Sequence, residues 1–203
     1  MQLTLCIVTK NKSMHTTTLH SAMTLNMICM TRGIHLSIQF IENSESNIQK
    51  ILKTCDRLIW IDYGVSVTQQ TLERLLETND WNISVVPCVT NEVDWDQFRK
   101  KTLSSECNEP VHQRALKFDI ESRPIQKKND VLEYVSGTPR VFCVDSKPVL
   151  KKLRDTDTSF KSMDQLKKMG VKICVLKSET VTCHYVYECI GNILESSGVR
   201  TSK

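Results

Sequence analysis

The first hundred residues alternate short apolar runs with stretches of helical periodicity, and this alternation limits the chain to a few folds. Short runs rich in Leu, Ile and Val are typical of buried strands, whereas apolar residues spaced three and four apart are typical of helices. The expected strands are residues 3–9, 34–41, 57–62 and 83–89, and the expected helices cover 16–30, begin near 46 and begin after 68. Strands separated by helices in this way predict βαβ units.

We therefore predict a single α/β domain over residues 1–203, with a mostly parallel, Rossmann-like sheet and helices on both faces. The second half is less regular. Further strands are expected at 115–120, 140–145 and 171–176, and further helices from Ser146 and over 162–169. Two polar stretches, 100–109 and 122–130, are typical of loops. Residues 181–185 suit a strand, 184–194 suit a helix, and 197–203 suit a flexible tail.

The helix expected over 16–30 has an apolar stripe that we expect to face the core. Its members are Leu19, Ala22, Met23, Met27 and Met30. Gly33 follows, and a glycine just beyond a helix commonly ends it by taking a left-handed conformation.

The charge of the chain is mild and dispersed. There are 27 Lys and Arg against 23 Asp and Glu, a net charge of +4, and aromatic residues make up only 6%. A nucleic-acid-binding protein usually concentrates basic charge and adds aromatic residues for stacking, so nucleic acid is not an expected partner. No apolar run approaches the length of a transmembrane helix, and residues 1–5 lack a basic signal region. We therefore expect a cytoplasmic protein.

The nine cysteines form no C-x-x-C pair, and most lie inside apolar runs. This pattern favours small buried side chains in a reducing compartment over disulfides or zinc. The local group of Cys183, His184 and Cys189 does not have the usual spacing of zinc ligands. His15, His20, His35 and His112 show no sequence partners and are expected to be structural.

The common phosphate-binding and nucleophile motifs are absent. The sequence has no G-x-G-x-x-G, no G-x-x-x-x-G-K-[ST] and no G-x-S-x-G, and it contains only six glycines. These absences leave α/β proteins that bind nucleotides without a glycine-rich loop.

Three segments carry a resemblance to a known family. The apolar strand Leu58-Ile59-Trp60-Ile61 ends at Asp62, followed by Tyr63-Gly64 and a helix. This segment resembles the central strand of GT-A glycosyltransferases, which ends in an Asp-x-Asp motif. The segment 5–11 is similar to their first strand and nucleotide-contacting loop. The segment 86–98, with Pro87 and then Asp94-Trp95-Asp96, resembles the following strand in glycosyltransferase domains of large DNA viruses and some bacteria.

The resemblance implies transfer of a sugar from a nucleotide sugar to a hydroxyl of a glycan or protein acceptor. Residues 1–100 would form the half that binds the nucleotide sugar, and 101–196 the acceptor side. The implied contacts to the nucleotide sugar are Thr9, Lys10, Asn11, Glu42, Asn43, Asp62 and Tyr63. The implied catalytic bases are Asp94 and Asp96, and the implied metal ligands are Asp62 and His184.

Gly64 stands where the family has its second Asp, so the motif has lost one ligand and one charge. A divalent Mn²⁺ or Mg²⁺ ion offsets the diphosphate charge when oxygen ligands hold it. The loss of the second Asp therefore weakens the expected metal dependence. The sequence leaves a non-catalytic binding or scaffolding module as the alternative. A nucleotidyltransferase is disfavoured because residues 9–13 lack glycine. Asp62 as a turn residue, and Asp94 or Asp96 as a helix cap, are the structural alternatives for the acids.

Overall fold

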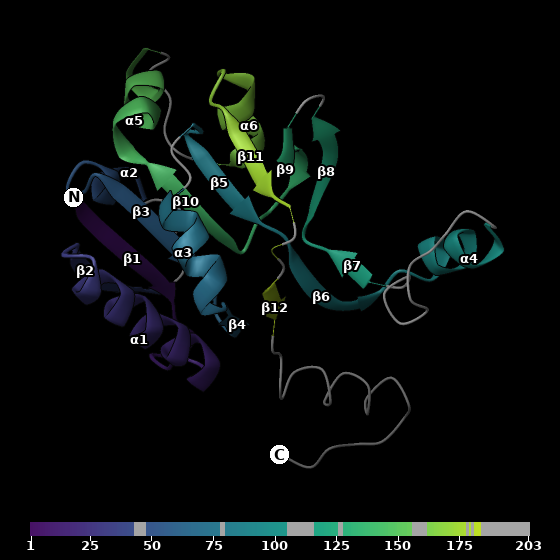
Figure 1. The fold of residues 1–203 in the computed structure, drawn as a ribbon, viewed down its shortest axis with the longest axis horizontal. Helices are drawn as coiled ribbons and strands as arrows, with labels where there is room; N and C mark the ends of the chain where they lie inside the picture. The colour runs from purple at the N-terminus through teal and green to yellow at the C-terminus, as the bar shows by residue number, and fades with distance from the viewer. Residues whose placement is uncertain are drawn as a thin grey trace.

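The computed structural model describes residues 1–42, 48–77, 80–104, 116–125, 128–155, 162–177, 179 and 181–183, which form an α/β fold (Figure 1). The strands are β1 (Gln2–Val8), β2 (His35–Ile41), β3 (Arg57–Ile61), β4 (Val65–Ser66), β5 (Ile83–Val86), β6 (Cys88–Val93), β7 (Leu116–Phe118), β8 (Ile120–Ile125), β9 (Lys128–Gly137), β10 (Val141–Asp145), β11 (Ile173–Leu176) and β12 (Val181–Cys183). The helices are α1 (Thr16–Thr31), α2 (Ile48–Leu52), α3 (Gln69–Glu77), α4 (Trp95–Leu103), α5 (Ser146–Asp155) and α6 (Met163–Lys168).

The large sheet has eight strands in the order β2-β1-β3-β10-β5-β11-β9-β8. Strands β2, β1, β3, β5, β11 and β8 run in one direction, and β10 and β9 run in the other. The predicted α/β class is confirmed, and the antiparallel members come from the less regular second half of the sequence. A smaller sheet with the order β4-β12-β6-β7 continues from the large one, because the chain passes directly from β5 into β6 at Pro87.

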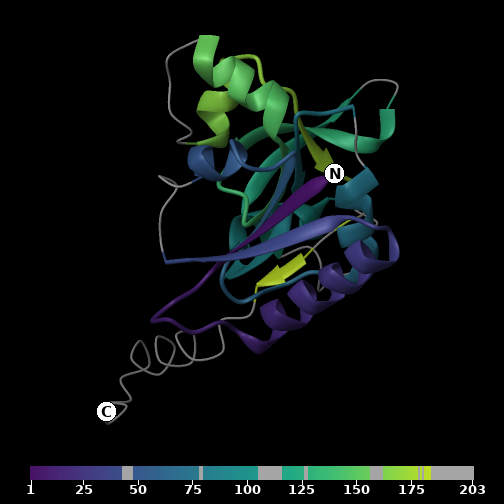
Figure 2. The same ribbon diagram turned by 90° about the vertical axis from the view of Figure 1, so that its left-hand side faces the viewer.

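Helices cover both faces of the large sheet, as predicted (Figure 2). One core cluster joins the odd-numbered residues of β1 to α1 and α3, and it includes Leu5, Leu25 and Leu72. The other joins the even-numbered residues of β3 to α2, α5 and α6, and it includes Leu58 and Val149. Because successive strand residues point to opposite faces, each central strand contributes to both clusters, and this explains why all five residues of β3 are buried.

The predicted burial of the methionine stripe on α1 is wrong. Met23, Met27 and Met30 are 61%, 68% and 73% exposed. A second apolar stripe of α1 faces inward, formed by Ala22, Leu25, Ile28 and Cys29. On the same side, the hydroxyls of Thr18 and Ser21 donate to the carbonyls of Val65 and Val67 at 3.0 and 3.2 Å. Both stripes have helical spacing, so spacing alone does not decide which one faces the core.

Both stretches expected to be loops contain regular structure. Helix α4 extends to Leu103, and the polar stretch 122–130 belongs largely to the β8–β9 hairpin at the edge of the large sheet. Most side chains of β8 are exposed, so the strand needs little apolar alternation, and its sequence therefore has no strand signal.

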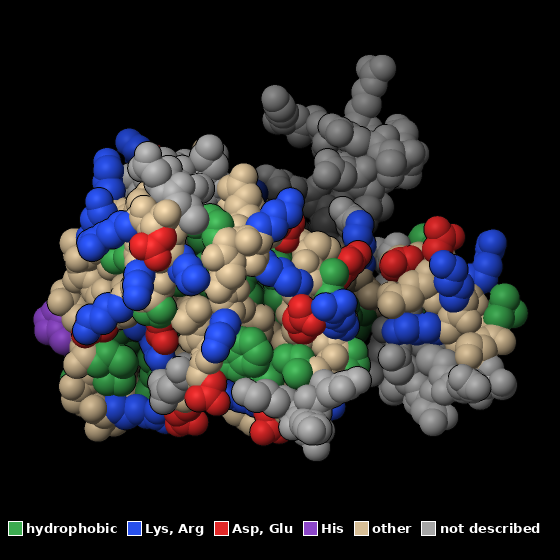
Figure 3. Space-filling model, turned by 90° about the horizontal axis from the view of Figure 1, so that it is seen from above, with side chains coloured by type: hydrophobic (Ala, Val, Ile, Leu, Met, Phe, Trp, Pro, Cys, Tyr) green, Lys and Arg blue, Asp and Glu red, His purple; other side chains and the backbone are tan. Residues whose placement is uncertain are grey.

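Several surface ion pairs support the second half of the fold. Arg123 Nε lies 2.6 Å from Glu133 Oε2, and Lys167 Nζ lies 3.3 Å from Glu133 Oε1. The face over α5 and α6 carries many Lys and Arg side chains, with Asp and Glu among them (Figure 3). Exposed pairs of this kind contribute little stability each.

Across the described residues, no helix is long and apolar enough to cross a membrane.

Gly137 is the glycine on which the hairpin depends. Its φ is +122°, and a Cβ there would lie 2.5 Å from the carbonyl oxygen of Asp119. We expect Gly137→Ala to lower the free energy of unfolding by about 3 kcal/mol or more, because backbone atoms on the neighbouring strand must move. Gly33→Ala is the matched control. Gly33 has φ +61° with open space around it, so only the left-handed cost of about 1–2 kcal/mol applies. Urea unfolding followed by circular dichroism compares the two, and equal losses would contradict the contact.

The buried cysteines give a second expectation. Burial raises the pKa of the Cys6 and Cys143 thiols to about 12. Because the thiolate is the reactive form, neither thiol should react with iodoacetamide at pH 8 in the native protein, whereas both should react in denaturant. Peptide mapping by mass spectrometry measures this, and rapid native labelling of either cysteine would contradict the buried placement.

Candidate active site

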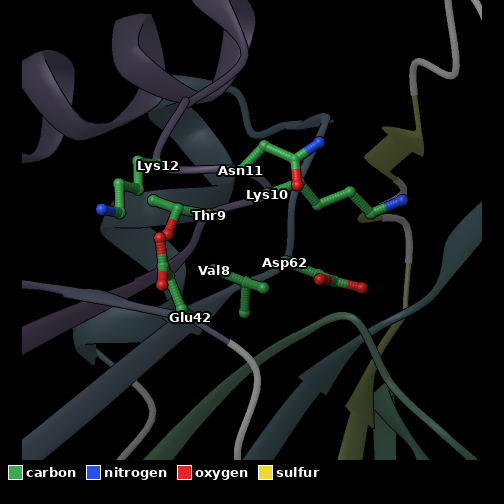
Figure 4. Close-up of a pocket in the computed structure, with 7 residues that line it drawn as sticks. All are labelled: Val8, Thr9, Lys10, Asn11, Lys12, Glu42 and Asp62. Carbon is green, nitrogen blue, oxygen red and sulfur yellow. The ribbon is translucent and has the colours of Figure 1, made fainter.

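A cavity of about 840 Å³ opens at the carboxyl ends of β1, β2 and β3 (Figure 4). Its lining residues are Val8, Thr9, Lys10, Asn11, Lys12, Glu42 and Asp62. The structure thus brings together five of the predicted contacts, which are Thr9, Lys10, Asn11, Glu42 and Asp62. The carboxyl ends of parallel strands are where open α/β sheets bind ligands. Val8 and Lys12 were not predicted, although their places beside the loop at 9–11 already pointed to them.

The loop after β1 is a tight hairpin turn. The Lys10 N–H donates to the Ser13 carbonyl at 3.1 Å, and the Ser13 N–H donates to the Lys10 carbonyl at 2.9 Å. The two central residues, Asn11 and Lys12, have φ of +50° and +58°. Two-residue hairpins of this kind need positive φ at both central positions and usually place glycine at the second. A lysine there holds strained backbone, and strain of this sort concentrates at functional sites.

Thr9 joins the ends of β1 and β2 at the floor of the cavity. Its N–H donates to the Ile41 carbonyl at 2.9 Å, and its hydroxyl approaches the same oxygen at 3.3 Å. Glu42 follows Ile41 directly, so these bonds determine where the Glu42 carboxylate lies relative to the β1 loop. Asn43 lies outside the described residues, and its predicted contact to a nucleotide stays a prediction.

Asp62 begins a tight turn at the end of β3. Its carbonyl accepts from the Val65 N–H at 3.4 Å, and its Oδ1 accepts from the Tyr63 N–H at 2.7 Å. Gly64, the third residue of this turn, has φ +73°, a conformation that glycine adopts without steric cost. The conformation of this turn therefore favours glycine at position 64.

Tyr63 connects the turn to the β1 loop and to α1. The Lys10 Nζ lies 5.3 Å from the centre of the Tyr63 ring, and the His15 ring meets Tyr63 edge-on with centroids 6.2 Å apart. His15 also caps α1, because its Nδ1 accepts from the Thr17 N–H at 3.3 Å. The sequence shows no partner for His15, and only the fold brings it beside Tyr63.

Asp119, which no sequence pattern indicated, helps to hold Asp62 in place through a chain of hydrogen bonds. Its Oδ1 accepts from the Cys88 N–H at 2.8 Å, and its Oδ2 accepts from the Arg140 N–H at 2.9 Å. The Arg140 carbonyl in turn accepts from the Asp62 N–H at 2.9 Å. Burial raises the pKa of the Asp119 carboxyl, while the two backbone donors favour its charged form. This chain of bonds links the start of β6 and the start of β10 to the end of β3.

The predicted catalytic acids do not line the cavity. Asp94 is the N-cap of α4 and accepts from the Gln97 N–H at 2.8 Å through its Oδ1. Asp96 is exposed in the first turn of the same helix, where a carboxylate stabilises the helix dipole. Helix α4 stands at the far side of the molecule from α1 (Figure 1). Their catalytic role stays a prediction.

The residues that the structure describes do not form a divalent-cation site on their own. No three His, Cys, Asp or Glu side chains gather anywhere within the described ranges. Hard cations such as Mg²⁺ favour oxygen ligands, usually one or two carboxylates together with phosphates of the substrate. Asp62 offers one carboxylate, one oxygen of which already accepts the Tyr63 N–H. The other predicted ligand, His184, lies outside the described residues.

The sequence matches no protein-family model and no curated protein. This chain is similar in general chain path to a number of solved structures. One is the inositol-1-phosphate CTP transferase from T. maritima (TM-score 0.44, 9% identity, covering 98% of each chain). Another is the galactosyltransferase LgtC with donor and acceptor sugar analogs (TM-score 0.39, 10% identity, covering 100% of this chain and 98% of that one). A further one is a glycosyltransferase involved in glycosylation of the major capsid of PBCV-1 (TM-score 0.35, 11% identity, covering 97% of this chain and 99% of that one). Likeness at this level assigns no activity to the chain.

The requirement for glycine at position 64 can be tested directly. We expect Gly64→Ala to lower the free energy of unfolding by about 1–2 kcal/mol, because an L side chain is strained at positive φ. Gly64→Asn should lose less, because Asn tolerates this conformation better. Urea unfolding compares the two variants with the wild type. Equal stability of Gly64→Ala and wild type would show that the turn does not select glycine.

Proposed function

We propose that this protein is a GT-A-like glycosyltransferase that moves a sugar from a nucleotide-sugar donor to a hydroxyl of a glycan or protein acceptor. The observation that supports this most is the meeting of the β1 loop, Glu42 and Asp62 around one cavity at the carboxyl ends of three parallel strands. The cavity volume of about 840 Å³ lies in the range of small-molecule sites.

Different lining residues would contact different parts of such a donor. Glu42 and Thr9 provide acceptor oxygens for ribose hydroxyls at the end of β2. Asp62 and Lys10 face the cavity beside Tyr63 and would lie near the diphosphate and the sugar. Hydrogen bonds from hydroxyls to these carboxylates are charge-assisted and therefore strong.

The transfer itself needs a base for the acceptor. The acceptor oxygen attacks the anomeric carbon, the bond from that carbon to the diphosphate oxygen breaks, and the nucleoside diphosphate leaves with the electron pair. In a transfer with inversion, a carboxylate takes the proton of the acceptor hydroxyl. We propose Asp94 or Asp96 for this role, and because neither lines the cavity, the role requires that the acceptor hydroxyl come within reach of α4. Of the two, Asp96 is the one that is not the N-cap of α4.

A non-catalytic binding module is the second candidate. Two observations favour it. The cavity contains a single Asp at the strand end, and Asp94 already serves as a helix cap. The two candidates differ in turnover, since only an enzyme releases nucleoside diphosphate from a nucleotide sugar in the presence of an acceptor.

Binding is tested by thermal unfolding against a panel of nucleoside diphosphates and nucleotide sugars. A ligand at about 100 times its Kd adds about 2.7 kcal/mol to stability, which gives a clear rise in Tm. We expect Asp62→Ala to weaken binding of the responding nucleotide sugar at least about tenfold, because it loses hydrogen bonds to a charged group. Asp62→Asn keeps an acceptor for the Tyr63 N–H and separates the loss of charge from damage to the turn.

The control is Asp130→Ala, because Asp130 is an exposed acid on β9 outside the cavity. Its affinity should equal that of the wild type. Unchanged affinity in both Asp62 variants would overturn the assignment of this site.

A further inference from the structure

The charged side chains of the cavity divide into two groups. Figure 4 shows Lys10 on the side of Asp62, and Lys12 on the side of Glu42. These two lysines are the basic residues among those that line the cavity. A nucleoside diphosphate brings about two to three negative charges to a site that already holds two carboxylates, so binding needs compensating positive charge.

The end of β3 is poorly suited to supply that charge through a divalent cation. The turn at Asp62 favours glycine at position 64, with φ +73°, and glycine contributes no second carboxylate there. One oxygen of Asp62 accepts from the Tyr63 backbone. Within the described part of the chain no three His, Cys, Asp or Glu side chains gather, and the other carboxylate of the cavity, Glu42, lies on the side of Lys12.

Lys10 lies where its ammonium can supply the positive charge that a diphosphate needs. The paired hydrogen bonds between Lys10 and Ser13 hold the backbone at the base of its side chain. Its ammonium lies 5.3 Å from the centre of the Tyr63 ring, an attractive contact between a cation and an aromatic face. Tyr63 is the residue next to Asp62, so this contact keeps the ammonium at the Asp62 end of the cavity.

We propose that the Lys10 ammonium, held over the Tyr63 ring beside Asp62, binds the diphosphate of the donor in place of a divalent cation. The inference rests on the proposed function and adds to it that this site binds its nucleotide without metal. In the transfer, Lys10 stabilises the negative charge that develops on the leaving diphosphate, and it donates hydrogen bonds without giving up its proton. Tyr63 acts as a positioning residue for Lys10.

The test is isothermal titration calorimetry of the full chain with ADP, CDP, GDP and UDP, each in EDTA and in Mn²⁺. The nucleoside of the best-binding base is titrated alongside. We expect the preferred diphosphate to bind in EDTA within about twofold of its affinity in Mn²⁺. Lys10→Met should weaken the diphosphate at least about tenfold and the nucleoside less than about twofold, because a charged hydrogen bond is lost only with the former.

Two further variants separate charge from shape. Lys10→Arg keeps a positive charge that can contact the Tyr63 ring and donate to phosphate, and it should retain diphosphate binding within about threefold. Lys53→Met removes an exposed lysine that follows α2 and lies outside the cavity, and it should leave affinity unchanged. The Tm of Lys10→Met without ligand, compared with that of wild type, shows that the variant is folded.

Two results would overturn the inference and leave the proposed function standing. One is diphosphate binding that is at least about tenfold tighter in Mn²⁺ than in EDTA, since a held cation acts as a ligand bridge. The other is Lys10→Met binding the diphosphate as tightly as the wild type. Absence of binding by every diphosphate in both buffers, together with no response to any nucleotide sugar, would overturn the proposed function and the inference with it.

Discussion

The insertion of β10 between β3 and β5 is the constraint on which the rest of the structure depends. β10 pairs antiparallel with β3 over its full length and with β5 from Val141 to Val144, so without it the two parts of the large sheet would have no shared edge. At one end, Arg57 Nε lies 2.6 Å from Asp145 Oδ1, with the arginine almost fully buried. At the other end, the Arg140 carbonyl accepts from the Asp62 N–H. Because the arginine is nearly inaccessible to solvent, loss of its partner would be costly. The pair joins the end of β10 to the start of β3, the strand that ends beside Asp62.

The candidate site therefore depends on both halves of the sequence, although its lining comes from the first half alone. Asp119 bonds to the backbone at Cys88 and Arg140, and Arg140 bonds to Asp62. The cavity residues lie on short turns at strand ends, and two of these turns contain residues with positive φ. Strands that are hydrogen-bonded on both sides hold such turns in place, and this explains how strained backbone persists at the mouth of the cavity.

Much of the fold was predictable because its cause is local. The apolar runs at β1, β3 and β5, the helix periodicity of α3, and Gly33 after α1 each have a physical reason within a few residues. The β8–β9 hairpin was missed because its exposed strands need no apolar pattern. The predicted inward face of α1 was wrong because a second apolar stripe, which includes Leu25 and Ile28, packs in the core instead. On that side Thr18 and Ser21 bond to Val65 and Val67, which lie more than 40 residues further along the chain.

For the site, the sequence by itself determined which residues stand at the strand ends: Thr9, Lys10, Asn11, Glu42 and Asp62. Their convergence follows from parallel strands, whose carboxyl ends share one edge of the sheet. Only the tertiary structure decided that Lys10 lies over Tyr63, that His15 joins them, and that Asp119 supports Asp62 through Arg140. The reason is that hydrogen bonds and ring contacts between distant segments exist only once strand order and register are set. The spacing of residues along the chain does not determine strand order or register.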